Sequence, residues 1–217
     1  ATQQAVAQSR AMRIDFGSAS TTTGSSSGQS WNDVAAGSST QPLALVDVAG
    51  AATGVSFGFS AGLELVNANS TGTTSPAMGS ALESLGWPIS ALRDSLWASG
   101  NSQPVSEFTL TGLEPTATYD VTIVASRMSA ADLRATRYTS HGARTVTAVI
   151  EPANNDSEFV RLSGLAADAS GALRVELSPF TTNTNSSAWY YVNAVGIDEF
   201  AQGTQAPLVG LSTNQLH

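Results

Sequence analysis

Apolar and polar residues alternate with a period of two along most of the chain. The clearest example is the stretch in which Leu173, Val175 and Leu177 alternate with Arg174 and Glu176. This period places the apolar side chains on one face of an extended strand, so it predicts strands that bury one face and expose the other. Similar stretches, separated by Gly, Asn, Asp and Pro, predict about ten strands in all. They lie at 12–16, 43–47, 55–59, 63–66, 106–110, 118–124, 134–139, 145–150, 159–162, 171–177 and 190–200.

One segment has helical rather than strand periodicity. Ile89, Leu92 and Leu96 recur at helical spacing, and Pro88 suits a first helical turn, so the sequence predicts one short helix at 88–97. Strands and helices do not alternate, which argues against a parallel α/β sheet. We therefore predict an all-β protein, a two-sheet antiparallel β-sandwich with one short helix.

The sequence predicts one domain with polar ends. Residues 11–200 form the predicted sandwich, 1–10 a flexible N-terminal segment, and 201–217 a C-terminal tail or linker. Within the domain, Leu113 and Pro115 precede Tyr119 with the spacing of a tyrosine corner, in which the Tyr hydroxyl bonds back to the preceding turn. Fibronectin-type domains have about 100 residues and two strands after this corner. Here about five strands follow it, which indicates one larger sandwich.

Four stretches, in their order along the chain, carry a resemblance to a known fold. They are 13–17 with Trp31-Asn32, 86–88 with 93–97, 113–119 and 126–127 with 134–139, and 190–198. This order resembles the galactose-binding-like jelly roll of carbohydrate-binding modules in secreted bacterial proteins, and more distantly the malectin-like domains. The resemblance implies that the first and last strands are neighbours. It also implies a carbohydrate-binding module, often with a structural calcium ion.

Composition narrows the partners and the chemistry. The 217-residue chain has a formal net charge of -8, and its nine basic residues are all Arg. Nucleic acid is therefore not expected as a partner, because binding it requires clustered cations. The chain has no Cys, which excludes disulfides, thiol catalysis and Cys-ligated zinc. It has only two His. No apolar run is long enough to span a bilayer, and the low-charge, Ser/Thr/Gly-rich composition indicates a secreted or cell-surface protein.

Calcium prefers six to eight oxygen ligands, several of them from carboxylates. If the first and last strands pair as the resemblance implies, Asp15 comes near Asp198 and Glu199, and Asp47 could add another oxygen. These four residues are the predicted metal ligands. The alternative is that they cap turns or pair with Arg13.

Sugar binding generally uses aromatic platforms for C–H faces and polar side chains for hydroxyl groups. Trp31 with Asn32, and Trp189 with Tyr190, combine both kinds of group. The alternative is that each Trp covers the core. Asn193 in the closing strand is also included among the predicted ligand-binding residues.

Arginines gather in one predicted hairpin region, where Arg127 and Arg134 precede Tyr138, and all three are predicted to bind ligand. Such arginines could hold the carboxylate of a uronic acid or a sulfate bidentately. The net charge of -8 weighs against acidic sugars unless this region is a local exception. The alternative is that the arginines pair with nearby carboxylates, namely Asp120, Asp132 and Glu151.

Catalytic signals are weak. Asp94-Ser95-Leu96 resembles the nucleophile motif of lipase-like esterases, but Ser95 falls within the predicted helix, and no Asp-x-x-His is present. His141 has no evident Ser or carboxylate partner. We therefore predict a non-catalytic module that binds polysaccharide or another glycan, attached to other domains of a larger protein. The alternatives are a structural or adhesion domain without a sugar ligand, and a small polysaccharide-active enzyme.

Overall fold

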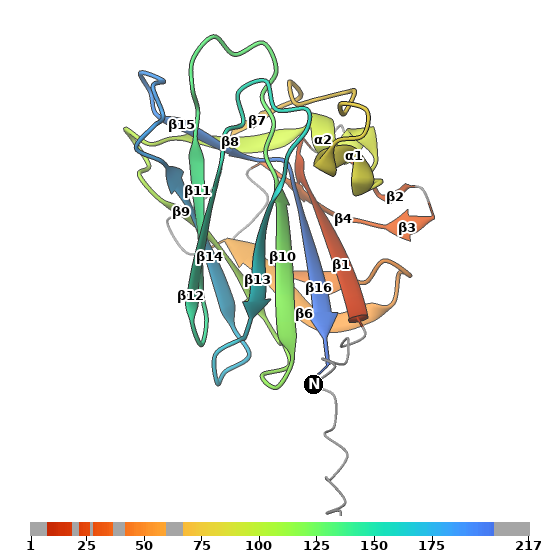
Figure 1. The fold of residues 1–217 in the computed structure, drawn as a ribbon. Coiled ribbons are helices and arrows are strands. Elements are labelled where there is room, and N and C mark those ends of the chain that lie inside the picture. Colours follow the sequence, from red (N-terminus) through yellow and green to blue (C-terminus); the bar gives the residue numbers. More distant parts are fainter. Residues whose placement is uncertain (1–7, 19–21, 27, 37–41, 60–66, 202–217) are drawn as a thin grey trace, which may run out of the picture.

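The computed structural model describes residues 8–18, 22–26, 28–36, 42–59 and 67–201, and this part of the chain contains sixteen strands and two short helices (Figure 1). Two large sheets dominate. The first has five strands, in the order β13 (Val160–Leu165), β10 (Thr118–Val124), β16 (Ala194–Phe200), β1 (Gln8–Gly17) and β4 (Asn32–Ala35). The second has six strands, in the order β12 (Thr145–Ile150), β11 (Thr136–His141), β14 (Leu173–Pro179), β9 (Ser106–Thr111), β6 (Ala52–Phe59) and β5 (Leu43–Val46).

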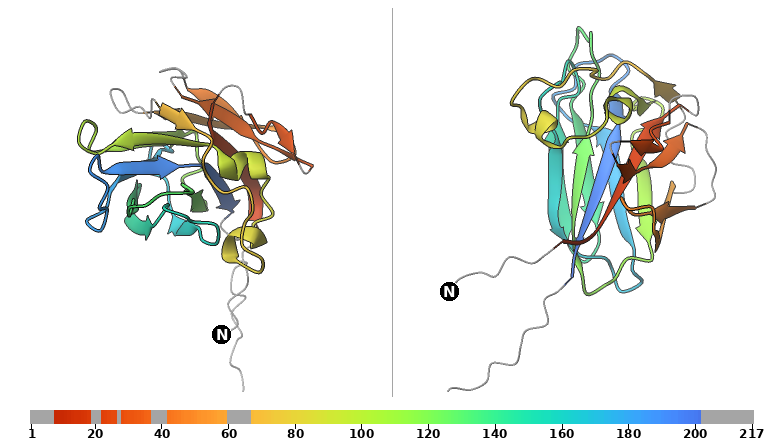
Figure 2. Two further views of the ribbon diagram at one scale, coloured as in Figure 1. Left: turned by 90° about the horizontal axis from the view of Figure 1, so that it is seen from above. Right: turned by 90° about the vertical axis from the view of Figure 1, so that its right-hand side faces the viewer.

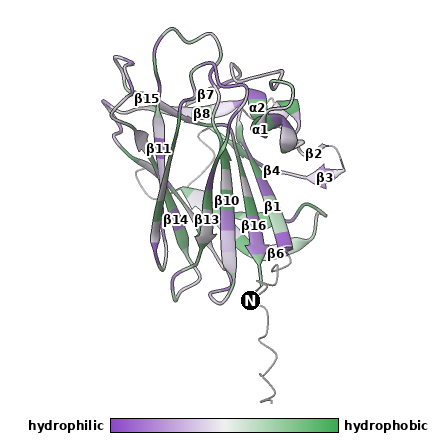
Figure 3. Ribbon diagram, in the orientation of Figure 1, coloured by the Kyte–Doolittle hydropathy of each residue, from purple (hydrophilic) through white to green (hydrophobic). Residues whose placement is uncertain are grey.

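The predicted antiparallel β-sandwich is confirmed. Neighbouring strands in both large sheets run antiparallel, except that β1 and β4 are parallel. The first and last strands of the sandwich, β1 and β16, pair along their length, as the resemblance implied. The strands of the two sheets carry mixed apolar and polar residues, which the period of two requires (Figure 3).

The core lies between the two large sheets. Met12, Ile14 and Phe16 occupy alternate positions of β1 and are fully buried. Phe108 on β9 is fully buried as well. Phe16 packs edge-on against Phe57 of the opposite sheet, with ring centroids 5.6 Å apart. Contacts of this kind across the sandwich bury the apolar face of each strand, and this burial is the main stabilising term of the fold.

Two smaller assemblies complete the fold. A three-stranded sheet of β15 (Trp189–Val192), β8 (Ser95–Ser99) and β7 (Asn67–Asn69) crosses one end of the sandwich (Figures 1 and 2). A two-stranded ribbon consists of β2 (Ser25–Ser26) and β3 (Gln29–Ser30).

A second apolar cluster lies on the outer face of the five-stranded sheet. It joins Leu82 of helix α1 (Ala81–Ser84), Leu92 of helix α2 (Ile89–Arg93), Trp31 and Trp87. The two Trp rings meet edge-on with centroids 5.4 Å apart. Gly196 of β16 makes room for them, because a Cβ atom there would lie 2.7 Å from the Trp87 ring. The two helices are therefore fixed to the sheet by Trp side chains.

The predicted helix at 88–97 is wrong at its C-terminal end. Helix α2 ends at Arg93, Asp94 is already extended, and β8 begins at Ser95. Leu96 is fully buried because β8 pairs with β7 and β15, and this pairing outweighs the helical spacing of Leu96. The sequence analysis missed helix α1, whose Ser80 cap accepts a hydrogen bond from the Glu83 amide at 3.1 Å.

The predicted tyrosine corner is confirmed. The hydroxyl of buried Tyr119 accepts a hydrogen bond from the Glu114 amide at 2.7 Å and donates to the Glu114 carbonyl at 3.1 Å. Burial raises the pKa of Tyr119 to about 12, and the negative charge of Glu199 adds to this effect.

The closing strand and the domain ends differ from prediction in detail. The segment predicted as one strand at 190–200 is two strands that belong to different sheets, with Asn193 between them. β1 begins at Gln8, within the segment 1–10 that was expected to be flexible. The predicted strand at 63–66 and residues 202–217 of the predicted tail lie outside the described residues.

Candidate functional site

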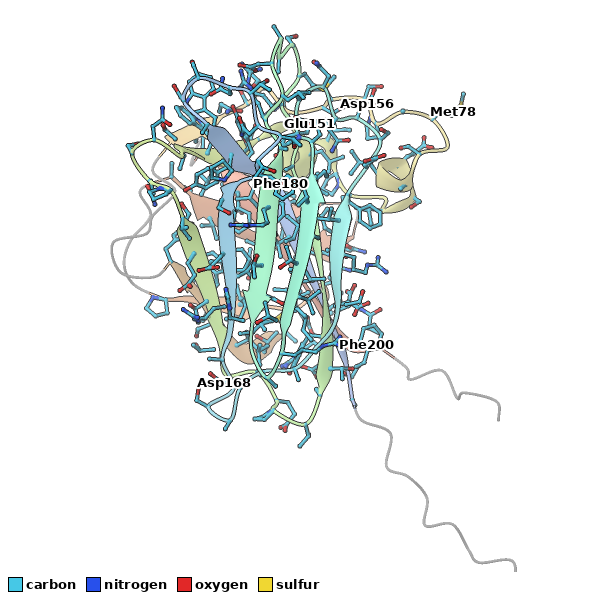
Figure 4. All side chains as sticks on the ribbon, turned by 60° about the vertical axis from the view of Figure 1, so that its left-hand side comes forward. Met78, Glu151, Asp156, Asp168, Phe180 and Phe200 are labelled. Carbon is cyan, nitrogen blue, oxygen red and sulfur yellow. The ribbon has the colours of Figure 1, made fainter. Side chains whose placement is uncertain are left out.

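Three loops meet at one end of the sandwich and enclose a hollow of about 580 Å³. They follow β7, β10 and β12 in the sequence. Figure 4 shows Asp156 of the third loop at the opposite end of the molecule from Asp168 and Phe200. The hollow is lined by Thr71, Gly72, Thr73, Thr74, Ser75, Arg127, Met128, Ser129 and Asp156.

Main-chain hydrogen bonds tie the three loops together. The Met128 amide donates to the Thr71 carbonyl at 2.7 Å, which joins the second loop to the first. The Arg127 amide donates to the Pro152 carbonyl at 2.7 Å, and the Ala77 amide donates to the Asp156 carbonyl at 2.8 Å. Each loop is therefore held by both of the others, which fixes the shape of the hollow.

Buried polar side chains beneath the hollow reinforce these ties. The Ser126 hydroxyl donates to the Asn155 carbonyl at 2.6 Å and accepts from the Thr73 amide at 2.9 Å. Asn193 accepts from the Ser126 amide at 2.9 Å and donates to the Leu92 carbonyl at 2.8 Å. Because buried polar groups must be satisfied, this network selects one arrangement of the loops.

Gly72 allows the first loop to approach the sheet closely. A Cβ atom at this position would lie 2.4 Å from the Leu92 carbonyl oxygen and 2.5 Å from Nδ2 of Asn193. Any other residue would push the loop outward. Glycine is therefore required here by contact rather than by a turn.

The hollow presents one cation, one anion and several hydroxyl groups. Arg127 is half-buried, and its Nη1 donates to the Met128 carbonyl. Asp156 is also half-buried, and it does not form an ion pair with Arg127. Thr74 and Ser129 are exposed at the rim. Groups of this kind can donate to and accept from vicinal sugar hydroxyls, and none of them is a nucleophile paired with a base.

An aromatic cluster of Trp97, Trp189 and Tyr191, together with Arg134, lies near the hollow. The Trp189 ring meets the Trp97 ring edge-on at 5.3 Å, and the Arg134 guanidinium lies 4.8 Å from the Trp189 ring centroid. Nη1 of Arg134 donates to the Tyr191 hydroxyl. Burial raises the pKa of Tyr191, whereas Arg134 and Arg127 oppose this rise, so both guanidinium groups interact with the Tyr191 hydroxyl. Trp189 is partly exposed and belongs to this cluster.

Of the residues predicted to bind ligand, Arg127 alone lines the hollow. Trp31 lies in the second apolar cluster, where it covers the sheet as the alternative reading proposed. Asn32 is buried and links β1 to β5, since its amide donates to the carbonyls of Arg13 and Val46 at 2.9 Å each. Arg134 pairs with Asp132 at 2.7 Å, again as the alternative proposed.

Three further predicted ligand-binding residues are fully buried. The Tyr138 hydroxyl donates to the Tyr191 carbonyl, and the Tyr190 hydroxyl donates to the Gln103 carbonyl at 2.8 Å. Asn193 belongs to the network beneath the hollow. These side chains have no surface to offer a polysaccharide in this conformation, so they serve the fold rather than direct binding.

The four predicted calcium ligands do not form one site. Asp198 pairs with Arg13 at 2.9 Å, and Glu199 pairs with Arg10. Asp47 caps a turn by accepting from two amides at 2.9 Å each, and Asp15 is buried beside the Thr23 amide. No group of three or more His, Cys, Asp or Glu side chains arranged to hold a metal ion occurs in the part of the chain that the structure describes. These carboxylates therefore do not fit a shared calcium ion.

The residues considered for catalysis also have structural surroundings. Ser95 begins β8 rather than lying within a helix, and its hydroxyl donates to Oδ1 of Asn69 at 3.0 Å. His141 does have a carboxylate neighbour, because its Nε2 lies 2.7 Å from Oε2 of Glu176. The side chains of His141 on β11 and Glu176 on the neighbouring strand β14 lie on the outer face of the six-stranded sheet.

Most of the hollow was not predicted from the sequence, namely 71–75, Met128, Ser129 and Asp156. Ser129 has a positive φ of 58°, and a Ser residue in the sequence does not predict this conformation. Asp156 follows an Asn-Asn pair whose turn character could have indicated a loop at the same end as Arg127. Nothing in the sequence links it to 71–75.

No helix among the described residues is long and apolar enough to cross a membrane. Fold and site together define the class of the molecule, an antiparallel two-sheet β-sandwich with a polar hollow between its end loops. No protein-family model and no curated protein matches the sequence.

Solved structures show the same fold at low sequence identity. The extracellular domain of ANXUR1 from Arabidopsis thaliana is 11% identical, with a TM-score of 0.51, and the alignment covers 87% of this chain and 48% of that one. The plant receptor-like kinase FER is 12% identical, with a TM-score of 0.56, and the alignment covers 88% of this chain and 50% of that one. The chain thus spans about half the length of these two proteins. TmCBM61, solved with β-1,4-galactotriose, aligns over 50% of this chain with a TM-score of 0.29, so its likeness carries no argument.

Proposed function

We propose that this protein is a non-catalytic carbohydrate-binding domain of a larger secreted or cell-surface protein. It binds a polysaccharide or another glycan in the hollow around Arg127 and Asp156. The observation that carries the proposal is the construction of the hollow: three loops, tied by main-chain bonds and a buried network, hold opposite charges and hydroxyl groups around one space. Such preorganisation lowers the entropy cost of binding a polar ligand.

The chemistry of the hollow suits a sugar. Sugar hydroxyls both donate and accept, so they pair with a guanidinium on one side and a carboxylate on the other. Thr74, Ser75 and Ser129 add hydroxyl groups at the rim. Trp189 is a partly exposed aromatic ring in the neighbouring cluster and can contact the C–H face of a further sugar unit.

The proposal is tested by glycan binding with matched Arg variants. Affinity electrophoresis through gels that contain a broad panel of polysaccharides should show retarded migration, which Arg127→Ala abolishes. Arg144→Ala is the matched control, since Arg144 is an exposed Arg in the β11–β12 hairpin at the opposite end of the sandwich (Figure 1). Absence of retardation across the panel would refute the proposal.

The same samples separate the alternatives. Self-association by light scattering without glycan binding would indicate a structural or adhesion domain. Release of reducing ends from a polysaccharide of the panel would indicate an enzyme.

A further inference from the structure

Arg127 differs from the other eight arginines in its surroundings. Five arginines have a carboxylate partner, namely Arg10, Arg13, Arg93, Arg134 and Arg174. Three others, Arg137, Arg144 and Arg161, are exposed to solvent. Arg127 alone is half-buried and forms no ion pair with the acidic residues that the structure describes. A partly desolvated cation without a counter-ion is costly, which makes it a candidate for binding an anion.

The hydrogen-bonding capacity of Arg127 is only partly used within the part of the chain that the structure describes. Its guanidinium has five N–H donors. One nitrogen donates to the Met128 carbonyl, and the guanidinium also forms a hydrogen bond with the Tyr191 hydroxyl. None of its nitrogens is among the buried atoms that lack a partner, so the unused donors face accessible space. Because Arg127 lines the hollow, this accessible space includes the hollow.

We propose that the hollow selects an acidic sugar, whose uronate carboxylate pairs with Arg127. This inference rests on the proposed function and names its ligand class. A planar carboxylate accepts two parallel hydrogen bonds from one guanidinium, and this bidentate geometry distinguishes Arg from Lys. The hydroxyls of Thr74, Ser75 and Ser129 remain for the ring hydroxyls of the same sugar unit.

The negative charge of Asp156 restricts where an acidic group can bind in the hollow. Its carboxylate lines the same hollow as Arg127 but does not neutralise it. Like charges repel, so Asp156 disfavours an acidic group anywhere in the hollow except beside Arg127, while it still accepts from sugar hydroxyls. For an acidic ligand, Asp156→Asn therefore strengthens binding. For a neutral ligand, the loss of a charged acceptor weakens binding.

The test compares oligouronates with their carboxyl-reduced, neutral forms by titration calorimetry at low salt. We expect the unmodified protein to bind an oligouronate at least about tenfold more tightly than its neutral form, as a desolvated charge pair allows. Arg127→Ala should remove this preference, and Arg127→Lys should restore only part of it. Asp156→Asn should raise uronate affinity by about two- to fivefold. Arg144→Ala should leave all affinities unchanged, and melting curves should show that each variant is folded.

Two results would overturn the inference and are distinct from failure of the proposed function. If the neutral form binds as tightly as the uronate and Arg127→Ala abolishes both, the domain binds glycans but does not select acidic ones. If Asp156→Asn weakens uronate binding, the carboxylate of Asp156 helps the ligand more as a charged acceptor than it repels it, and the charge argument is wrong. If no glycan of either kind binds, the proposed function itself fails.

Discussion

Asp15 is a buried carboxylate among other carboxylates, and it makes the stability of the protein depend on pH. The residue is 3% exposed, Oδ1 has no hydrogen-bond partner among the described residues, and Oδ2 accepts from the Thr23 amide at 3.1 Å. Burial raises the pKa of Asp15 from 3.8 to about 7. The negative charges of Asp33 and Asp94 add to the rise, and the hydrogen bonds of Thr23 oppose it.

The sign of the effect follows from comparing folded and unfolded chains. Between pH 3.8 and about 7, the folded protein keeps the Asp15 proton while the unfolded chain releases it. The stability that this proton contributes is complete below pH 3.8 and is lost as the pH rises to about 7. One pKa unit corresponds to about 1.4 kcal/mol, so a shift of about three units predicts a loss of the order of 4 kcal/mol.

Urea unfolding at pH 4.5, 6.0 and 7.5 measures this dependence. We expect Asp15→Asn to gain stability relative to the parent protein as the pH rises, because the amide stays neutral when buried. Asp156→Asn, which removes a half-buried carboxylate, is the matched control. Parallel pH profiles for Asp15→Asn and the parent protein would refute the reasoning.

Three further predictions concern the structure around the site. Asn193→Ala should lower the free energy of unfolding by about 2–4 kcal/mol in urea melts, because it leaves the Ser126 amide and the Leu92 carbonyl buried without their partner; a loss below about 0.5 kcal/mol would contradict this. Gly196→Ala should cost about 1–3 kcal/mol and change the Trp fluorescence spectrum, because the added methyl group meets the Trp87 ring; an unchanged spectrum and melting curve would show that the ring moves freely. Chelation with EDTA should leave Tm unchanged, because the four predicted calcium ligands are separately engaged; a lowered Tm would reinstate a stabilising metal ion.

Most of the fold follows from local patterns in the sequence. The period of two gives the strand faces, and the spacing before Tyr119 gives the tyrosine corner, because both depend on neighbours in sequence. The predicted helix was wrong for the opposite reason. Its periodic residues do not share one buried face, since Ile89 is 40% exposed and Leu96 is buried in a strand. Pairing with distant strands decides the conformation of that segment.

The site is less accessible from the sequence because its parts are distant in the chain. Arg127 was recognised as a rare cation, but 71–75 and Asp156 join it only through the sandwich topology. Trp31 misled for a physical reason. It looks like a loop platform in sequence, yet the helices need an apolar anchor on the outer sheet face, and the rings of Trp31 and Trp87 supply it. Aromatic type alone does not distinguish an anchor from a platform.

The most direct test of this account is a titration of the protein and of Arg127→Ala with the polysaccharide that retards the protein most in affinity electrophoresis. The account predicts that Arg127→Ala abolishes binding while its melting curve stays close to that of the parent protein. Undiminished binding by the folded Arg127→Ala variant would contradict the assignment of the hollow as the glycan site.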